Sequence, residues 1–140
     1  MTTNRIAIVP EVTELTRPYW EGAARGTLLL QRCGACGRFR HPPTVVCADC
    51  GAFEVDWVPA SGRGVLHSYT TVIHPVHAAV QDKVPYNVVL IDLEEGVRVV
   101  STVVDATEDD LAVGLPVAVV FEMLTPSIGL PKFQIVRGAS

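Results

Sequence analysis

The sequence predicts a mainly β protein with one short helix near its N-terminus, and three observations support this prediction. Hydrophobic residues make up 49% of the 140 residues, and valine dominates among them, which favours strands. Apolar runs of strand length recur from Val65 onward. Before these runs lie the four cysteines of the chain, in two similar motifs. We expect three units: residues 1–26 as an arm and helix, residues 27–60 as a cysteine-bearing ribbon, and residues 61–140 as a β-barrel.

The predicted helix begins near Thr16, a residue type that caps helices through its side chain. Pro18 would lie in the first turn and Gly26 just beyond the end, as is common at these positions. One face of this helix would carry Tyr19, Trp20, Ala23 and Ala24. This face would pack either on the protein's own core or on another subunit, and the sequence favours neither.

The two cysteine motifs are typical of a structural zinc site. Cys33 and Cys36 form the first C-x2-C motif, Cys47 and Cys50 form the second, and a glycine follows each. Four thiolates suit tetrahedral Zn²⁺ and leave no open position for water or substrate. Glycine can adopt the positive φ that each tight turn needs. We therefore expect all four cysteines to bind one structural zinc ion.

Two disulfides, or a redox-active pair, are the alternatives for these cysteines. Disulfides need an oxidising compartment, and the apolar run Ile6–Val9 is shorter than the roughly 7–15 residues of a signal-peptide core. The run Val117–Phe121 is far below the about 20 residues of a membrane span. We expect a cytoplasmic protein with metal-bound thiolates and no membrane segment.

The ribbon unit contains three predicted segments. Thr27–Arg32 is expected to be a strand leading into the first motif, and Phe39–Pro43 to carry the chain to the second. Phe53, Val55 and Trp57 alternate with acidic residues, which predicts a half-buried strand. Ser61–Gly64 then marks a turn into the next unit.

Five strands are predicted after this turn, with Glu94-Glu95-Gly96 as a hairpin turn and Thr107–Leu111 as one helical turn. A long first strand and a helical turn after the third strand favour a closed Greek-key barrel of the OB type. The predicted strands are Val65–Ile73, Tyr86–Leu93, Val97–Val104, Val117–Glu122 and Phe133–Val136.

Charge is unevenly distributed along a chain of net charge −4. Residues 22–48 contain four arginines and no acid, whereas residues 92–110 are strongly acidic. The arginines would either neutralise the thiolates or bind a phosphorylated ligand, because guanidinium groups match phosphate oxygens. These arginines are Arg25, Arg32, Arg38 and Arg40.

No residue pattern indicates catalysis. With the cysteines committed to a metal, the histidines are the candidate bases, and His67 is expected in the barrel wall. His74 and His77 flank Pro75-Val76, where they would form a second metal site or an acid–base pair, or simply be solvated. No G-x-S-x-G motif marks a serine nucleophile. The histidines are His41, His67, His74 and His77.

Binding of single-stranded nucleic acid is an alternative function, because OB barrels often have it. Such a site needs a basic groove with aromatic side chains. This chain is acidic, and Tyr69, Tyr86, Phe121 and Phe133 have few lysines or arginines near them in the sequence. An acidic surface repels a polyanion.

The order of several short motifs from about Tyr19 to Phe133 resembles that of the DUF35 family. The motifs are Tyr19–Gly22, Gly26–Cys33, His41–Pro43, Cys47–Gly51, Gly62–Gly64, Pro85-Tyr86 and Leu130–Phe133. The resemblance implies a helix, a rubredoxin-like zinc ribbon with the four cysteines as ligands, and an OB barrel. It also implies a non-catalytic accessory subunit, in a hetero-oligomer with a thiolase-like acyl-CoA enzyme such as a lipid-transfer-protein-like aldolase, a thiolase or an acyltransferase.

The resemblance also allows a MaoC-like enoyl-CoA hydratase as the partner, and a CoA thioester at a site shared with the partner. Together with the charge pattern described above, this gives the expectation that Arg25, Arg32, Arg38 and Arg40 contact the phosphates of the CoA.

Overall fold

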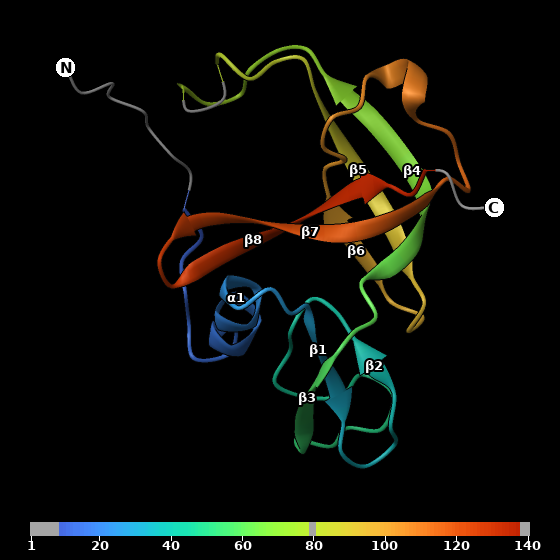
Figure 1. Ribbon diagram of the computed structural model, residues 1–140. Helices are drawn as coiled ribbons and strands as arrows, with labels where there is room; N and C mark the ends of the chain where they lie inside the picture. The colour runs from blue at the N-terminus through green and yellow to red at the C-terminus, as the bar shows by residue number, and fades with distance from the viewer. Residues whose placement is uncertain (1–8, 79–80, 138–140) are drawn as a thin grey trace.

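The computed structural model describes residues 9–78 and 81–137, which form one helix, a small sheet and a curled five-stranded sheet. Helix α1 (Arg17–Ala24) comes first (Figure 1). The expected helix is confirmed, with Pro18 in its first turn and Gly26 at φ +78° beyond its end. The predicted side-chain cap is wrong. Thr16 precedes the helix but makes no capping hydrogen bond, because its Oγ1 accepts the Thr13 N–H at 3.1 Å instead.

The small sheet has the strand order β2-β1-β3 and is antiparallel. Its central strand β1 (Leu29–Cys33) ends at the first cysteine. The strand β2 (Phe39–Arg40) is only two residues long, and β3 is Val55–Pro59. Phe53 was expected to share the buried face of β3, but it precedes the strand and is 69% exposed. The alternating pattern therefore begins at Val55.

The larger sheet has the order β6-β5-β4-β7-β8 and curls into the OB-like barrel that the sequence predicts. Strand β5 confirms its predicted bounds, Tyr86–Leu93. The other strands are β4 (Arg63–Val72), β6 (Arg98–Ser101), β7 (Pro116–Thr125) and β8 (Ile128–Ile135). The expected helical turn is the 3-10 helix η2 (Glu108–Asp110).

Strand β6 ends three residues before the predicted Val104. Beyond Ser101, hydrogen bonds that involve Asn87 replace the regular ladder between β5 and β6. Asn87 Oδ1 accepts the Val103 N–H at 2.7 Å, and the Thr102 hydroxyl donates to the Asn87 carbonyl at 2.9 Å. The chain then turns across the end of the barrel. Phe133 N–H donates to the Thr102 carbonyl at 3.0 Å and Val104 N–H to the Phe133 carbonyl at 2.8 Å. These bonds connect the segment that follows β6 to the strand β8.

Strand β8 begins at Ile128, five residues before the predicted Phe133. Pro131 favoured a loop there, since proline lacks an N–H donor. However, β8 is an outer strand of the sheet, where proline is tolerated. Pro131 lies opposite Phe121, and its carbonyl accepts the Ser101 hydroxyl at 3.0 Å. The tail of the predicted strand, Val136, falls just outside β8.

One hydrophobic core connects the ribbon with the barrel. Leu28 and Leu30 from the start of the ribbon lie in the same buried cluster as the barrel residues. Helix α1 also packs closely on the barrel, because a Cβ at Gly129 of β8 would lie 2.5 Å from the Ala23 backbone. The barrel members of the cluster are Leu66, Val89, Ile91, Leu93, Val99, Val103, Leu111, Val117 and Phe133.

The described helices are short. α1 has eight residues, and none of the helices in residues 9–78 and 81–137 has the length and apolarity of a membrane span.

Candidate metal centre

Two equivalent turns position the cysteines at the end of the ribbon. The first follows β1, where the Gly37 N–H donates to the Cys33 carbonyl at 3.0 Å. In the second, the Gly51 N–H donates to the Cys47 carbonyl at 2.8 Å. Both glycines have positive φ, +79° and +77°, as predicted for the residue after each motif. A side chain at either position would strain the backbone.

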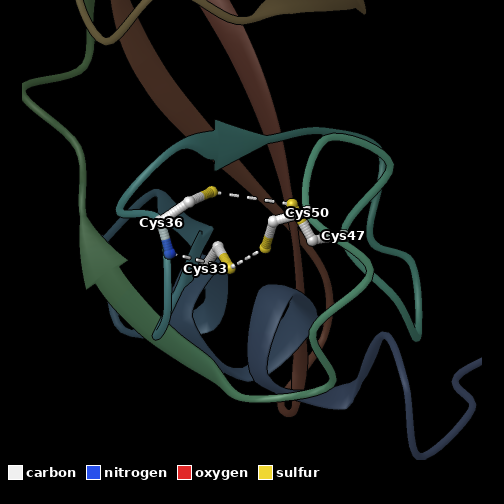
Figure 2. Close-up of side chains that lie close together, drawn as sticks. All are labelled: Cys33, Cys36, Cys47 and Cys50. Carbon is white, nitrogen blue, oxygen red and sulfur yellow. Dashed lines mark hydrogen bonds between the residues drawn. The ribbon is translucent and has the colours of Figure 1, made fainter.

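The four cysteine Sγ atoms converge on one point between these turns (Figure 2). All lie within 4.8 Å of one another, with 3.5 Å between Cys33 and Cys50 and 3.7 Å between Cys36 and Cys47. A tetrahedral zinc ion with Zn–S bonds of about 2.3 Å separates its sulfur atoms by about 3.8 Å. A disulfide would require about 2.05 Å, and all four cysteines are free. The geometry therefore fits a tetrathiolate metal site and not the disulfide alternative.

Backbone N–H groups in the turns favour the thiolate form of two cysteines. The N–H groups of Cys36 and Ala35, each 3.4 Å from the Cys33 Sγ, lower the pKa of Cys33 to about 6. The Cys50 and Asp49 N–H groups lower the pKa of Cys47 in the same way. These turns thus stabilise negative charge on sulfur before a cation balances it.

The pKa of Cys50 is raised to about 12. The Ala52 N–H lowers it, but hydrogen bonding with the Cys33 thiol and with the other cysteines outweighs this effect. Without a cation, one thiolate therefore opposes the ionisation of its neighbour, whereas a bound cation would stabilise all four.

The cluster lies at the boundary between protein and solvent. Cys33 and Cys47 are buried, whereas Cys36 and Cys50 are exposed. Four sulfur ligands would complete the coordination of Zn²⁺, so the site fits a structural ion better than a catalytic one.

Comparisons with known proteins agree with this architecture. The family model of the ChsH2 rubredoxin-like zinc ribbon domain matches residues 20–56, and that of the ChsH2 C-terminal OB-fold domain matches residues 57–122. A DUF35 domain-containing scaffold protein of Methanothermobacter thermautotrophicus is 32% identical over 79% of this chain and 83% of its own length. The chain belongs to the DUF35 family.

A solved structure described as the Ltp2-ChsH2(DUF35) aldolase is also similar to this DUF35 chain. It has a TM-score of 0.81 and 36% identity, and the match covers 91% of this chain and 98% of that one. A probable enoyl-CoA hydratase alpha subunit of Thermomonospora curvata is 39% identical over 83% of this chain. The match covers only 36% of that relative, so the DUF35 chain spans about a third of its length.

The four arginines of residues 22–48 come from different parts of the fold. Arg32 lies opposite Phe39 and Gln31 opposite Arg40. Since neighbouring residues of a strand point to opposite faces, Arg32 and Arg40 lie on opposite faces of the small sheet. Arg25 follows the last residue of α1. Arg32 and Arg40 therefore face different sides of the small sheet, and the contact of the four arginines with a phosphate stays a prediction.

Three of these arginines have partners within the ribbon. Arg32 donates to the Gly37 carbonyl at 3.0 Å and lies 5.5 Å from the centre of the Phe39 ring. Arg38 pairs loosely with Asp49 at 3.9 Å, and its side chain is 71% exposed. Arg40 donates to Gln31 Oε1 at 2.9 Å and to the Thr44 carbonyl at 3.1 Å. Among the described residues, the Arg25 side chain makes no hydrogen bond or ion pair, so Arg25 and Arg38 are the most available for a ligand.

Gln31 is an important ribbon residue that sequence reasoning missed. It is buried, with 1% of its surface exposed. Its Oε1 accepts hydrogen bonds from Arg40 and from the Thr44 N–H at 2.8 Å. The one available signal was a polar residue among the leucines of β1, which does not reveal its partners.

The histidines are separate from the cysteine cluster. His74 and His77 are exposed after β4, and no group of three potential ligands in the described chain includes either of them. His67 Nδ1 lies 3.1 Å from Asp92 Oδ2. His41 packs beside Tyr19, with 5.3 Å between the ring centres, and burial lowers its pKa. The role of His74 and His77 stays a prediction.

Proposed function

We propose that this DUF35 chain is a non-catalytic accessory subunit that binds and supports a thiolase-like acyl-CoA enzyme. The observation that carries the proposal is the match over nearly the whole length of one chain of the Ltp2-ChsH2(DUF35) aldolase. The scaffold name of the methanogen relative supports it independently. The thiolase-like partner would be a lipid-transfer-protein-like aldolase, a thiolase or an acyltransferase.

The metal site supports a bracing role in such an assembly. Cys33, Cys36, Cys47 and Cys50 would hold one Zn²⁺, which would fix the two turns to each other and leave no position for substrate. We assign the N-terminal arm and the helix to residues 1–26, the ribbon to 27–60 and the barrel to 61–140. A reducing, cytoplasmic location would keep the thiolates available to the metal.

A MaoC-like enoyl-CoA hydratase is the second candidate partner. The relative from Thermomonospora curvata favours it, since this relative is named as a hydratase alpha subunit and the match covers only part of its length. In that arrangement the region equivalent to this chain would be one part of a larger subunit.

Co-expression tests the two candidates directly. The chain would be produced with an affinity tag beside a thiolase-like enzyme, and separately beside a MaoC-like hydratase, from the same genome. We expect the thiolase-like enzyme to co-purify in a stable complex and to lose solubility or activity without the chain. An isolated, monomeric chain that releases CoA from an acyl-CoA would contradict the accessory role.

A contact between the ribbon and a CoA phosphate is a separate proposal, for which Arg25 and Arg38 provide the cleanest test. Reversing their charge should weaken acyl-CoA binding by the complex, roughly two- to fivefold for each exposed pair, with unchanged zinc content. Arg63→Glu is the matched control, because Arg63 is also exposed but lies at the start of the barrel. Arg40 is unsuitable, since its substitution would also disturb Gln31 and Thr44.

A further inference from the structure

The second half of β4 has an edge that no other strand of the described chain covers. β4 pairs with β5 from Gly64 to Val72, but with β7 only from Arg63 to Val65. One more pair of backbone bonds joins Leu66 to residues 114 and 115. From Ser68 to Val72, no backbone–backbone hydrogen bond among the described residues engages the groups that point away from β5. Figure 1 shows this half of β4 running on past the start of β7.

The composition of this edge allows another strand to add. Proteins usually protect free edges with charged residues, proline, bulges or a covering segment. Ser68–Val72 contains no charged residue and no proline, and its residues are exposed or half-buried. The one bulge of the β4–β5 pair lies before the edge, between Leu66 and Ser68. Unpaired backbone groups of this kind bind extended peptides by strand addition.

A cleft of about 470 Å³ lies beside the same half of β4. Its lining includes Thr71 and Ile73, Asn87 of β5 and the segment Ala106–Glu108. Thr71 lies directly opposite Asn87, so the two side chains share the face of the sheet that borders the cleft. The Thr71 hydroxyl is buried and has no hydrogen-bond partner in the described part of the chain. A residue opposite Thr71 on an added strand would share this face and reach the cleft.

The segment that lines one side of the cleft, residues 106–108, belongs to an acidic run of the chain, and this run is called the rim below. Four carboxylates lie between positions 105 and 110, and of these the Thr107 N–H engages only Asp110, at 2.8 Å. Glu108 and Asp109 are exposed and form no ion pair within the described ranges. This rim would repel the phosphates of a nucleotide and attract lysine or arginine. A second copy of the chain that pairs through the same edge would not supply that charge, because Ser68–Val72 contains no basic residue.

We propose that the Ser68–Val72 edge of β4 binds an extended, basic segment of a partner polypeptide as an added strand. The inward side chain of this segment occupies the cleft at Thr71, and its basic residues pair with Glu108 and Asp109. This surface belongs to the barrel and does not depend on the accessory role proposed above, so either proposal can fail without the other.

The test uses the full, zinc-loaded chain and a short peptide of alternating valine and threonine with a lysine at each end. Amide exchange followed by NMR locates the binding surface, and titration gives the affinity. We expect amides within Ser68–Val72 to exchange at least about tenfold more slowly when the peptide is bound. The same peptide methylated at alternate backbone nitrogens should not bind, because it cannot complete a ladder of hydrogen bonds.

Charge reversal provides the matched control. Glu108→Lys and Asp109→Lys should each weaken binding roughly two- to fivefold, the range of exposed ion pairs. Glu94→Lys makes the same charge change just beyond the end of β5 that lies away from the cleft, and should have no effect. The proposal is overturned if the methylated peptide binds equally well or if no peptide binds at millimolar concentration. It also fails if a simple alkyl compound binds in the cleft while the peptide leaves the amide exchange of Ser68–Val72 unchanged.

Discussion

A single buried amide, that of Gln31, fixes the segment between the two cysteine motifs to β1. It accepts hydrogen bonds from both Arg40 and Thr44 in the interior of the ribbon. Loss of such an acceptor leaves two donors without partners, and each buried unsatisfied group costs about 1–3 kcal/mol. Loss of the exposed ion pair between Arg38 and Asp49 should cost much less, because water can replace either partner.

Gln31→Leu should therefore lower the free energy of unfolding of the zinc-loaded protein by at least about 1–3 kcal/mol. Arg38→Ala should lower it by less than about 1 kcal/mol. Denaturant titration of both variants measures the difference. Equal losses would show that the buried amide has no special role.

Asp92 gives the barrel a local dependence on pH. The Arg98 guanidinium, 2.6 Å away, holds the pKa of Asp92 below its ordinary value, and His67 adds to this effect. A carboxyl group with a lowered pKa in the folded state stabilises the fold above its unfolded pKa. That contribution is lost as the pH falls below about 4 and the carboxylate takes up a proton.

Asp92→Asn should lower the free energy of unfolding at neutral pH by a small amount, because the group is partly exposed, and should make stability less sensitive to pH in the acidic range. Denaturant midpoints measured across the range check this expectation. Asp109→Asn is the control, since Asp109 is an exposed acid without an ion pair among the described residues. An acid response in the Asp92 variant as steep as in the parent protein would refute the assignment.

At the scale of elements, the contact of α1 with β8 depends on the absence of a side chain at Gly129. A Cβ at this position would lie 2.5 Å from the Ala23 carbonyl carbon and 2.7 Å from the Ala24 nitrogen. Both atoms belong to the helix backbone and cannot rotate away. The helix therefore packs directly against the strand backbone.

Gly129→Ala should push α1 away from the barrel and destabilise the fold by about 1–3 kcal/mol, as overpacking does. Zinc content should stay unchanged, because the cysteines lie elsewhere. Ser127→Ala, in the exposed turn of the same hairpin, is the control. Thermal unfolding and metal analysis together provide the measurement, and a variant as stable as its parent would contradict the packing.

The sequence predicted elements well where local pattern and tertiary context agree. Tyr86–Leu93 is a continuous apolar run bounded by turn residues, and it forms β5 with those limits. Prediction failed where a competing hydrogen-bond partner, or the position of a strand within the sheet, decides the outcome. Pro131 belongs to a strand because an outer position tolerates it, and Thr16 leaves the helix uncapped because Thr13 is nearby.

At the candidate site, too, local features were predictable and features that depend on tertiary contacts were not. The spacing of the four cysteines predicted that their sulfur atoms would cluster, since a C-x2-C turn brings each pair together locally. No local pattern could predict the partners of Gln31 or the cleft at Thr71. Both depend on segments that meet only in the folded chain.

At the scale of the whole molecule, the proposed zinc site and the barrel share their stability. Leu28 and Leu30 pack in the barrel core, and β1 then leads directly to Cys33. Loss of the metal would release the two turns and loosen β1, which would withdraw apolar side chains from the barrel. Disorder in the ribbon should therefore spread to the core.

Cys36→Ser, or treatment with a strong chelator, should abolish zinc binding and lower the melting temperature of the barrel by several degrees. Because zinc binding displaces protons from the thiols, acidification should also release the metal. Metal analysis beside thermal unfolding checks both results. A barrel that melts at the same temperature with and without zinc would show that the two units are independent.

The junction at β3 also constrains how the protein can be dissected. The two family models meet between residues 56 and 57, inside the strand Val55–Pro59. Division of the chain between these residues would interrupt the hydrogen bonds between β1 and β3. It would also separate Leu28 and Leu30 from the barrel residues of the core. Each fragment would expose apolar surface to water and tend to aggregate. Expression of the ribbon and the barrel as one polypeptide avoids this exposure.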